Sequence, residues 1–245
     1  MKSRALIGLS ILLVSTPSMA QAVTQKELSK FVPSSYRIVK WVEADLNGDK
    51  QKDVVIAVEA KNIRYGYSDN PPAKILVLFR KGKILEKAWE FSDGRSYVIG
   101  RGRTSRSRES LLQIEDLNRD EIPELLFSMA FIGASDAAIE TYVFMYHKKK
   151  FVSLLETPLS HPLDGGVVIR DLDKSKKGKE LMLYYAIWGE GEAHIDLHRY
   201  GAVYYAWNSM TQKYYPYKRI ETRQKGRTGL KELVLNKGPF WQDNP

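Results

Sequence analysis

A short acidic loop recurs in this chain, and its residue types and spacing suit the binding of a hard cation. The first copy, residues 45–53, reads Asp-Leu-Asn-Gly-Asp and closes with Asp; the second, residues 116–124, reads Asp-Leu-Asn-Arg-Asp and closes with Glu. A third copy begins at Asp171-Leu172-Asp173. Oxygen atoms at loop positions 1, 3, 5 and 9 can converge on calcium, which takes six to eight oxygen ligands at about 2.3–2.6 Å. The loops therefore predict calcium sites.

Each of the first two loops would supply four side-chain ligands and one backbone carbonyl, at position 7. The first set is Asp45, Asn47, Asp49, Gln51 and Asp53. The second set is Asp116, Asn118, Asp120, Ile122 and Glu124. In the third loop Lys179 holds position 9, Glu180 falls one place late and four lysines crowd the site, so we expect no metal there. The alternative for every copy is an Asx turn closed by its own hydrogen bonds.

These loops need strands to position them, and the pattern around each loop predicts a repeated unit. The order is strand, acidic loop, apolar strand, linker, strand, tight turn, strand, over residues 36–92, 110–157 and 166–220. Four short antiparallel strands per repeat are typical of a propeller blade. Residues 75–79 lack polar alternation, which indicates a strand covered on both faces. Thr24 and Glu27 form a capping-box pattern for a helix over about residues 24–31.

We therefore expect an all-β, propeller-like array of about three four-stranded antiparallel blades with a short N-terminal helix. An irregular antiparallel sandwich is the alternative. Closed propellers usually have four or more blades, so an open arc and closure by self-association both stay open. A bound calcium would have a structural role, because it would neutralise carboxylates between two buried strands.

The loop pattern Asp-x-Asn-x-Asp-x-x-x-Asp, running straight into an apolar strand, resembles FG-GAP and VCBS repeats, the calcium loops of integrin-α-type β-propellers. The opening segment, with Leu28, Phe31 and Pro33, resembles exported bacterial proteins that carry such repeats. The resemblance implies a propeller-like fold, calcium in the loops, and adhesion or partner binding without catalysis. Two features depart from it: Arg119 replaces the usual Gly of the loop, and Phe-Gly-Gly-Ala-Pro is absent.

The first twenty residues have the pattern of a secretory signal peptide. Lys2 and Arg4 precede an apolar stretch over residues 6–14, and Ser18-Met19-Ala20 is a small-x-small cleavage site. No second apolar run follows, so we expect no membrane span. The chain has no cysteine, which excludes disulfides and a bacterial lipid anchor. We expect a single periplasmic or secreted domain over residues 21–245, held by its core and by metal.

The chain is basic, with a formal charge of +9. Without the expected signal peptide, 36 basic side chains face 29 acidic ones, which leaves about +7. Basic residues cluster at 95–108, 174–179 and 218–231. Solvated loops are the ordinary interpretation. The alternative is a surface, centred on Arg95 to Arg108, that binds nucleic acid, acidic polysaccharide or lipid headgroups.

Candidates for catalysis are few. His194 and His198 lie four apart near Glu190, Glu192 and Asp196, but no Glu follows His194 as the zinc-protease motif requires. A polar linker is the simpler interpretation. Neither a Gly-x-Ser-x-Gly elbow nor a phosphate-binding loop is present. The abundant aromatic residues predict core packing, with a sugar- or peptide-stacking platform near Trp188 as the alternative.

The sequence thus predicts an exported calcium-binding β-propeller-like module for binding or scaffolding, with a protein or polysaccharide partner and no catalysis. Oligomers are possible. One alternative is an extracytoplasmic carbohydrate-active hydrolase that uses the Trp188 to His198 region. The other is a polyanion-binding protein that uses the Arg95 to Arg108 stretch.

Overall fold

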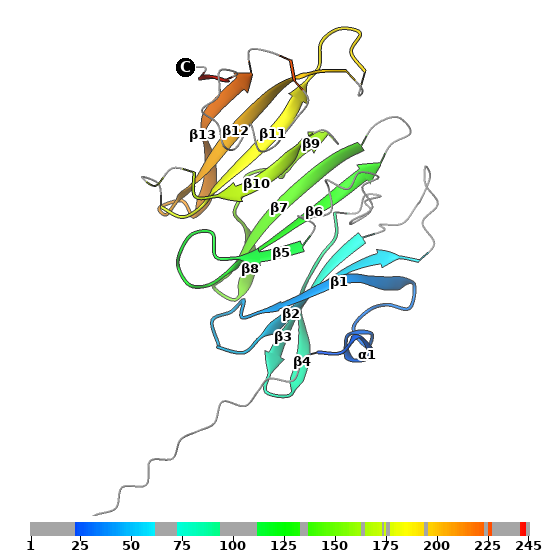
Figure 1. Cartoon of the computed structure of the whole chain (residues 1–245). Coiled ribbons are helices and arrows are strands. Elements are labelled where there is room, and N and C mark those ends of the chain that lie inside the picture. Colours follow the sequence, from blue (N-terminus) through cyan, green and yellow to red (C-terminus); the bar gives the residue numbers. More distant parts are fainter. Residues whose placement is uncertain are drawn as a thin grey trace, which may run out of the picture.

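The computed structural model describes residues 23–61, 73–93, 112–132, 137–162, 165–172, 174, 177–193, 196–222, 225–226 and 241–243. These residues form three antiparallel sheets and one short helix (Figure 1). Three predicted features lie outside the described residues: the signal peptide over 1–20, the basic stretch from Arg95 to Arg108, and His194. None of the helical structure in the described ranges is long and apolar enough to cross a membrane.

Helix α1 (Gln25–Leu28) begins at the predicted capping box. The Glu27 amide donates to Thr24 Oγ1 over 3.3 Å, and the Thr24 amide donates to Glu27 Oε2 over 2.9 Å. The helix ends at Leu28 rather than near residue 31, and hydrogen-bonded turns continue the segment. Leu28 is fully buried. It packs against the outer face of the first sheet, so it anchors the helix.

The first sheet is the predicted four-stranded unit, in which each strand pairs with the next along the chain. Its strands are β1 (Tyr36–Ala44), β2 (Asp53–Ala60), β3 (Ala73–Lys81) and β4 (Ile84–Phe91). The two central strands are buried over most of their length. This burial on both faces explains why residues 75–79 show no polar alternation, as the sequence predicted.

The other two sheets repeat this order but have five strands each, so the predicted count of four is corrected. The second holds β5 (Leu112–Glu115), β6 (Glu124–Ile132), β7 (Ala137–His147), β8 (Lys150–Ser153) and β9 (Leu159–Pro162). The third holds β10 (Gly166–Arg170), β11 (Glu180–Ile187), β12 (Arg199–Asn208), β13 (Lys213–Thr222) and β14 (Trp241–Asp243). The additional strands, β9 and β14, are too short to show a periodic pattern.

The sheets lie one after another in chain order, and apolar cores fill the spaces between them (Figure 1). Between the first and second sheets, Val55 and Ile75 pack with Phe127, whose ring stacks 5.8 Å from that of Phe144. Between the second and third sheets, Leu126, which precedes Phe127 on β6, packs with core residues of β11 and β12. Residues that alternate along β6 thus serve two different cores.

Candidate functional site

The three acidic loops lie in a row, because each joins the first two main strands of its sheet (Figure 1). A β-carbon added to Gly48 in the first loop would lie 3.6 Å from the Ile122 side chain in the second. The second loop in turn contacts the third, where the Lys179 amide donates to the Leu117 carbonyl over 2.7 Å. The three loops therefore form one continuous edge of the molecule.

In the first loop, Asp45 organises the backbone. Its Oδ1 accepts from the amides of Gly48 (2.8 Å) and Asp49 (3.1 Å), and its Oδ2 accepts from Lys50 (2.7 Å). Asp49 Oδ1 accepts from the Gln51 amide over 2.8 Å. Gly48 and Lys50 have left-handed φ angles of 78° and 67°. The acidic side chains thus hold a tight, specific turn.

The second loop has the same conformation despite its different sequence. Asp116 Oδ1 accepts from the amides of Arg119 (2.8 Å) and Asp120 (3.2 Å), and Oδ2 accepts from Glu121 (3.1 Å). Arg119 and Glu121 have φ angles of 61° and 72°. Arg119 therefore adopts the left-handed backbone that Gly48 adopts in the first loop. Its guanidinium reaches the third loop and pairs with Asp171 over 2.6 Å.

A fully buried carboxylate closes each loop from the first position of the following strand. In every case one oxygen accepts from the amide of the leucine near the loop start. The pairs are Leu46–Asp53 (3.0 Å), Leu117–Glu124 (2.7 Å) and Leu172–Glu180 (2.7 Å). Glu180 therefore takes the closing position of the third loop, which the sequence comparison had given to Lys179. Aligning the loops by the start of the following strand would have found it.

Burial disfavours the charged forms of the closing carboxylates in the first two loops, Asp53 and Glu124. Desolvation raises the pKa of Asp53 to about 6, and the charges of Asp49 and Asp45 add to the effect. Desolvation likewise raises the pKa of Glu124 to about 7, with contributions from Asp120 and Asp116. Neighbouring carboxylates disfavour the ionised form of such a group, and a nearby cation would favour it.

Asn118 is the unusual member of the second loop. Its Nδ2 donates to Asp120 Oδ2 over 3.0 Å and to Glu124 Oε1 over 2.6 Å. Its Oδ1 is buried and has no hydrogen-bond partner among the described residues. In the first loop the equivalent oxygen, on Asn47, accepts from the Asp49 amide over 2.9 Å. The second loop thus contains a buried acceptor that this structure leaves unsatisfied.

Gln51, the predicted position-7 residue of the first loop, contacts the β3–β4 turn through its side chain, which the sequence did not indicate. Gln51 Oε1 accepts from the Gly82 amide over 2.7 Å, in the turn between β3 and β4. Asp53 Oδ1 accepts from the Arg80 amide over 3.0 Å. The first loop is therefore hydrogen-bonded to the β3–β4 hairpin through these two side chains.

No three His, Cys, Asp or Glu side chains of the described residues are grouped as a ready-made metal site. The acidic oxygens instead accept backbone hydrogen bonds, as the Asx-turn alternative predicts. The loops bring together Asp, Asn and Glu oxygens within one turn, but binding a cation would require some of these bonds to rearrange. At Asn118 such a rearrangement would give a partner to Oδ1, which has none among the described residues.

The linker between β11 and β12 forms a second cluster of polar residues. His198 is only 2 % exposed, and its Nδ1 lies 2.8 Å from Glu192 Oε2. Lys225 also pairs with Glu192, and these contacts, with the Gly189 amide, lower the pKa of Glu192 to about 2. The Trp188 ring lies 4.4 Å from the imidazole. The buried imidazole indicates a structural pair more than a site open to substrate.

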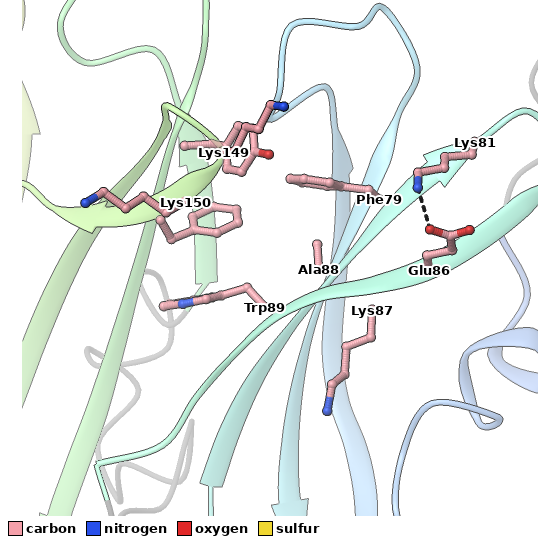
Figure 2. A pocket seen from close by; sticks show the side chains of 10 residues that line it. Phe79, Lys81, Glu86, Lys87, Ala88, Trp89, Lys149 and Lys150 are labelled. Carbon is pink, nitrogen blue, oxygen red and sulfur yellow. Dashed lines mark hydrogen bonds and ion pairs between the residues drawn. The ribbon is translucent and has the colours of Figure 1, made fainter.

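A groove of about 430 Å³ lies between the β3–β4 hairpin and the β7–β8 hairpin (Figure 2). Aromatic residues from both hairpins line it, and lysines surround them. These residues did not stand out in the sequence, since Trp89 at the end of the first set and Tyr146 at the start of the second are 57 positions apart along the chain. Their individual patterns are those of ordinary strand ends.

Comparison of the chain with models of protein families, with curated proteins and with solved structures found no match. Function is therefore inferred from the loops and surfaces described above.

Proposed function

We propose that this chain is an exported calcium-binding, β-propeller-like module that binds or scaffolds a partner. The observation that carries the metal part is Asn118, whose Oδ1 is buried and has no hydrogen-bond partner among the described residues, while its Nδ2 contacts the carboxylates of Asp120 and Glu124. An unsatisfied buried acceptor costs free energy, and a cation is the kind of partner that would satisfy it. The sequence pattern of residues 1–20 supports export.

The oxygen ligands that the first two loops offer suit calcium. Carboxylate and amide oxygens are the ligands that calcium prefers, and nitrogen or sulfur ligands are not needed. In the second loop Asp116, Asn118, Asp120, Glu124 and the Ile122 carbonyl would hold the ion. In the first loop Asp45, Asn47, Asp49, Asp53 and the Gln51 carbonyl would do so. Bound calcium would supply positive charge that offsets the carboxylates of each loop.

The sheet arrangement supports a propeller-like interpretation. Three antiparallel sheets follow one another in chain order, each pairs strands in the same sequence, and all three carry the acidic loop at the same place. Propeller blades are repeated four-stranded sheets of this kind. The three sheets would then be three blades, and the loops would stabilise adjacent blades because they touch one another.

The test is thermal unfolding of the chain from residue 21 onward, in millimolar calcium and in chelator. Calcium at a hundred times its dissociation constant adds about 2.7 kcal/mol to the free energy of unfolding. We expect the midpoint to rise with calcium, and to rise less in Asp49→Ala and in Asp120→Ala. Glu156→Ala, at an exposed position outside the loops, is the matched control and should respond like the wild type. An equal midpoint in calcium and chelator for the wild type would refute the metal assignment.

The alternative of a carbohydrate-active hydrolase would depend on the pair formed by His198 and Glu192. His198 Nε2 is buried without a partner among the described residues, while its Nδ1 faces Glu192. An imidazole oriented by a carboxylate is one arrangement of a general base. If this alternative holds, hydrolysis of a polysaccharide should be lost in His198→Ala and retained in Asp49→Ala. Hydrolysis retained in a folded His198→Ala variant would exclude a catalytic role for this pair.

A further inference from the structure

The groove between the two hairpins has an aromatic floor made by residues from both sheets. Its rings are those of Phe79, Trp89, Tyr146 and Phe151, all partly exposed. Figure 2 shows Phe79 and Trp89 on opposite sides of the space, with Lys149 above it and the Lys150 side chain extending to the left of it. A volume of about 430 Å³ is within the range of pockets that take small molecules or single units of a polymer.

The rings pack on one another and leave no slot between parallel planes. Trp89 stacks on Phe151 at 4.8 Å between ring centroids and 29° between planes. Phe79 meets Tyr146 edge-on, at 4.8 Å and 86°. A nucleic-acid base that inserts between two rings would have to separate these contacts. The floor instead offers a continuous apolar surface on which a saturated ring can lie.

The rim is positively charged. Lys81 and Lys87 line the groove but are paired, with Glu86 over 2.6 Å and with Glu90 over 2.8 Å. Lys149 and Lys150 are exposed, and within the described part of the chain neither has a carboxylate partner. Two ammonium groups are therefore available for an anion above the aromatic floor.

The β7–β8 turn has lysines at two positions where the backbone conformation disfavours them. Lys148 and Lys149 form the two-residue turn and have left-handed φ angles of 49° and 66°. Such turns favour Asn-Gly or Gly-Gly, because a β-carbon is unfavourable there. The equivalent β3–β4 turn uses Gly82, with φ of 63°. Strained residues that persist in a structure are candidates for function.

We propose that this groove binds uronate rings of an acidic polysaccharide. The apolar face of a sugar ring would lie on the aromatic floor near Trp89, and its carboxylate would pair with Lys149 and Lys150. The rim provides cations and few neutral hydrogen-bonding groups, so a charged sugar suits it better than a neutral one. This site goes beyond the proposed calcium loops, and its occupancy does not require metal in them.

The experiment measures the affinity of a galacturonate trisaccharide by calorimetry, with its methyl ester as the neutral probe. Lys149→Gly removes a groove lysine and relieves the strained φ. The matched control, Lys148→Gly, relieves the same strain at a neighbouring residue that does not line the groove. Both variants should fold at least as well as the wild type, which thermal unfolding checks. A charge-assisted contact corresponds to about a tenfold change in affinity.

We expect the trisaccharide to bind the wild type, and the methyl ester to bind at least about tenfold more weakly. Lys149→Gly and Lys150→Gln should weaken binding of the trisaccharide by a similar factor, and Lys148→Gly by less than about twofold. Equal weakening by Lys148→Gly, or unchanged binding in Lys149→Gly, would overturn the proposal. Tighter binding of a thymidine oligonucleotide than of the uronate would overturn it in favour of nucleic acid. Absence of uronate binding, with or without calcium, would also overturn it.

Discussion

Asn118 Nδ2 lies 2.6 Å from Glu124 Oε1, and the oxygen at the other end of the same amide is buried without a partner among the described residues. The neutral amide therefore occupies the space between the Glu124 and Asp120 carboxylates. Its N–H dipoles offset part of their repulsion. A carboxylate at position 118 could not do so, which makes this residue the sharpest probe of the metal proposal.

Asn118→Asp should destabilise the calcium-free protein and be rescued by calcium. The substitution places a third carboxylate beside two others in a buried site, which costs several kcal/mol without a cation. In chelator we expect the free energy of unfolding to fall by roughly 2–4 kcal/mol. In millimolar calcium the difference from the wild type should shrink or reverse. Denaturant unfolding under both conditions measures this.

Asn47→Asp is the companion variant in the first loop. Asn47 is half-buried and its oxygen already accepts a hydrogen bond, so the loss in chelator should be smaller. A loss in Asn118→Asp that calcium does not change would contradict a metal at the second loop.

Gly178→Ala should disturb the contact between the second and third loops. A β-carbon there would lie 2.5 Å from the Leu117 carbonyl oxygen, and φ is 83°. Gly191 is the matched control, since its φ is 74° and a β-carbon would meet nothing within 4 Å. We expect Gly191→Ala to cost about 1–2 kcal/mol for the backbone alone, and Gly178→Ala to cost more. Equal losses in denaturant unfolding would show that the loops do not pack as described.

The calcium-free protein should lose stability as pH rises from about 4.5 to about 7. The pKa of Glu124 is about 7 in the folded state and 4.5 is its ordinary value, so the folded state binds the proton more tightly. Glu124 therefore contributes its full stabilisation below pH 4.5. This contribution is lost as pH rises to about 7, and the loss is at most roughly 3 kcal/mol. Unfolding of the chelated protein at several pH values checks the direction.

Glu124→Gln is the control for that titration, because it removes the ionisable group and keeps a side-chain oxygen as acceptor for the Leu117 amide. Its stability should depend less on pH over the same interval. Calcium should also reduce the dependence in the wild type, since a cation favours the ionised carboxylate. A pH profile identical in Glu124→Gln would assign the effect to other groups.

Glu180→Ala should destabilise the third sheet without altering any calcium response. Glu180 is fully buried and its Oε2 accepts from the Leu172 amide over 2.7 Å. Leaving that amide unsatisfied costs about 1–3 kcal/mol. Exposed Glu156→Ala should cost less than about 0.5 kcal/mol. A loss of the calcium-dependent midpoint shift in Glu180→Ala would instead indicate that the third loop takes part in metal binding.

Much of the local structure follows from short-range patterns. The capping box at Thr24, the two-sided burial of β3 and the strand-loop-strand order around Asp45 and Asp116 were all predicted correctly. Each depends on hydrogen bonds or side-chain alternation within about ten residues. Strands β9 and β14 were missed because short edge strands depend on the strand they pair with and have no periodicity of their own.

The remaining features arise from contacts between residues far apart in the chain. Glu180 was missed as a closing carboxylate because one extra residue in the third loop shifts it from position 9, and the folded structure places it on the Leu172 amide. The orphaned oxygen of Asn118 depends on how deeply neighbouring loops bury it. The aromatic groove joins Trp89 to Phe151, which belong to different sheets. Residue types and spacing indicate which groups can bind a ligand, whereas the packing of sheet against sheet sets which of them are buried, paired or exposed to it.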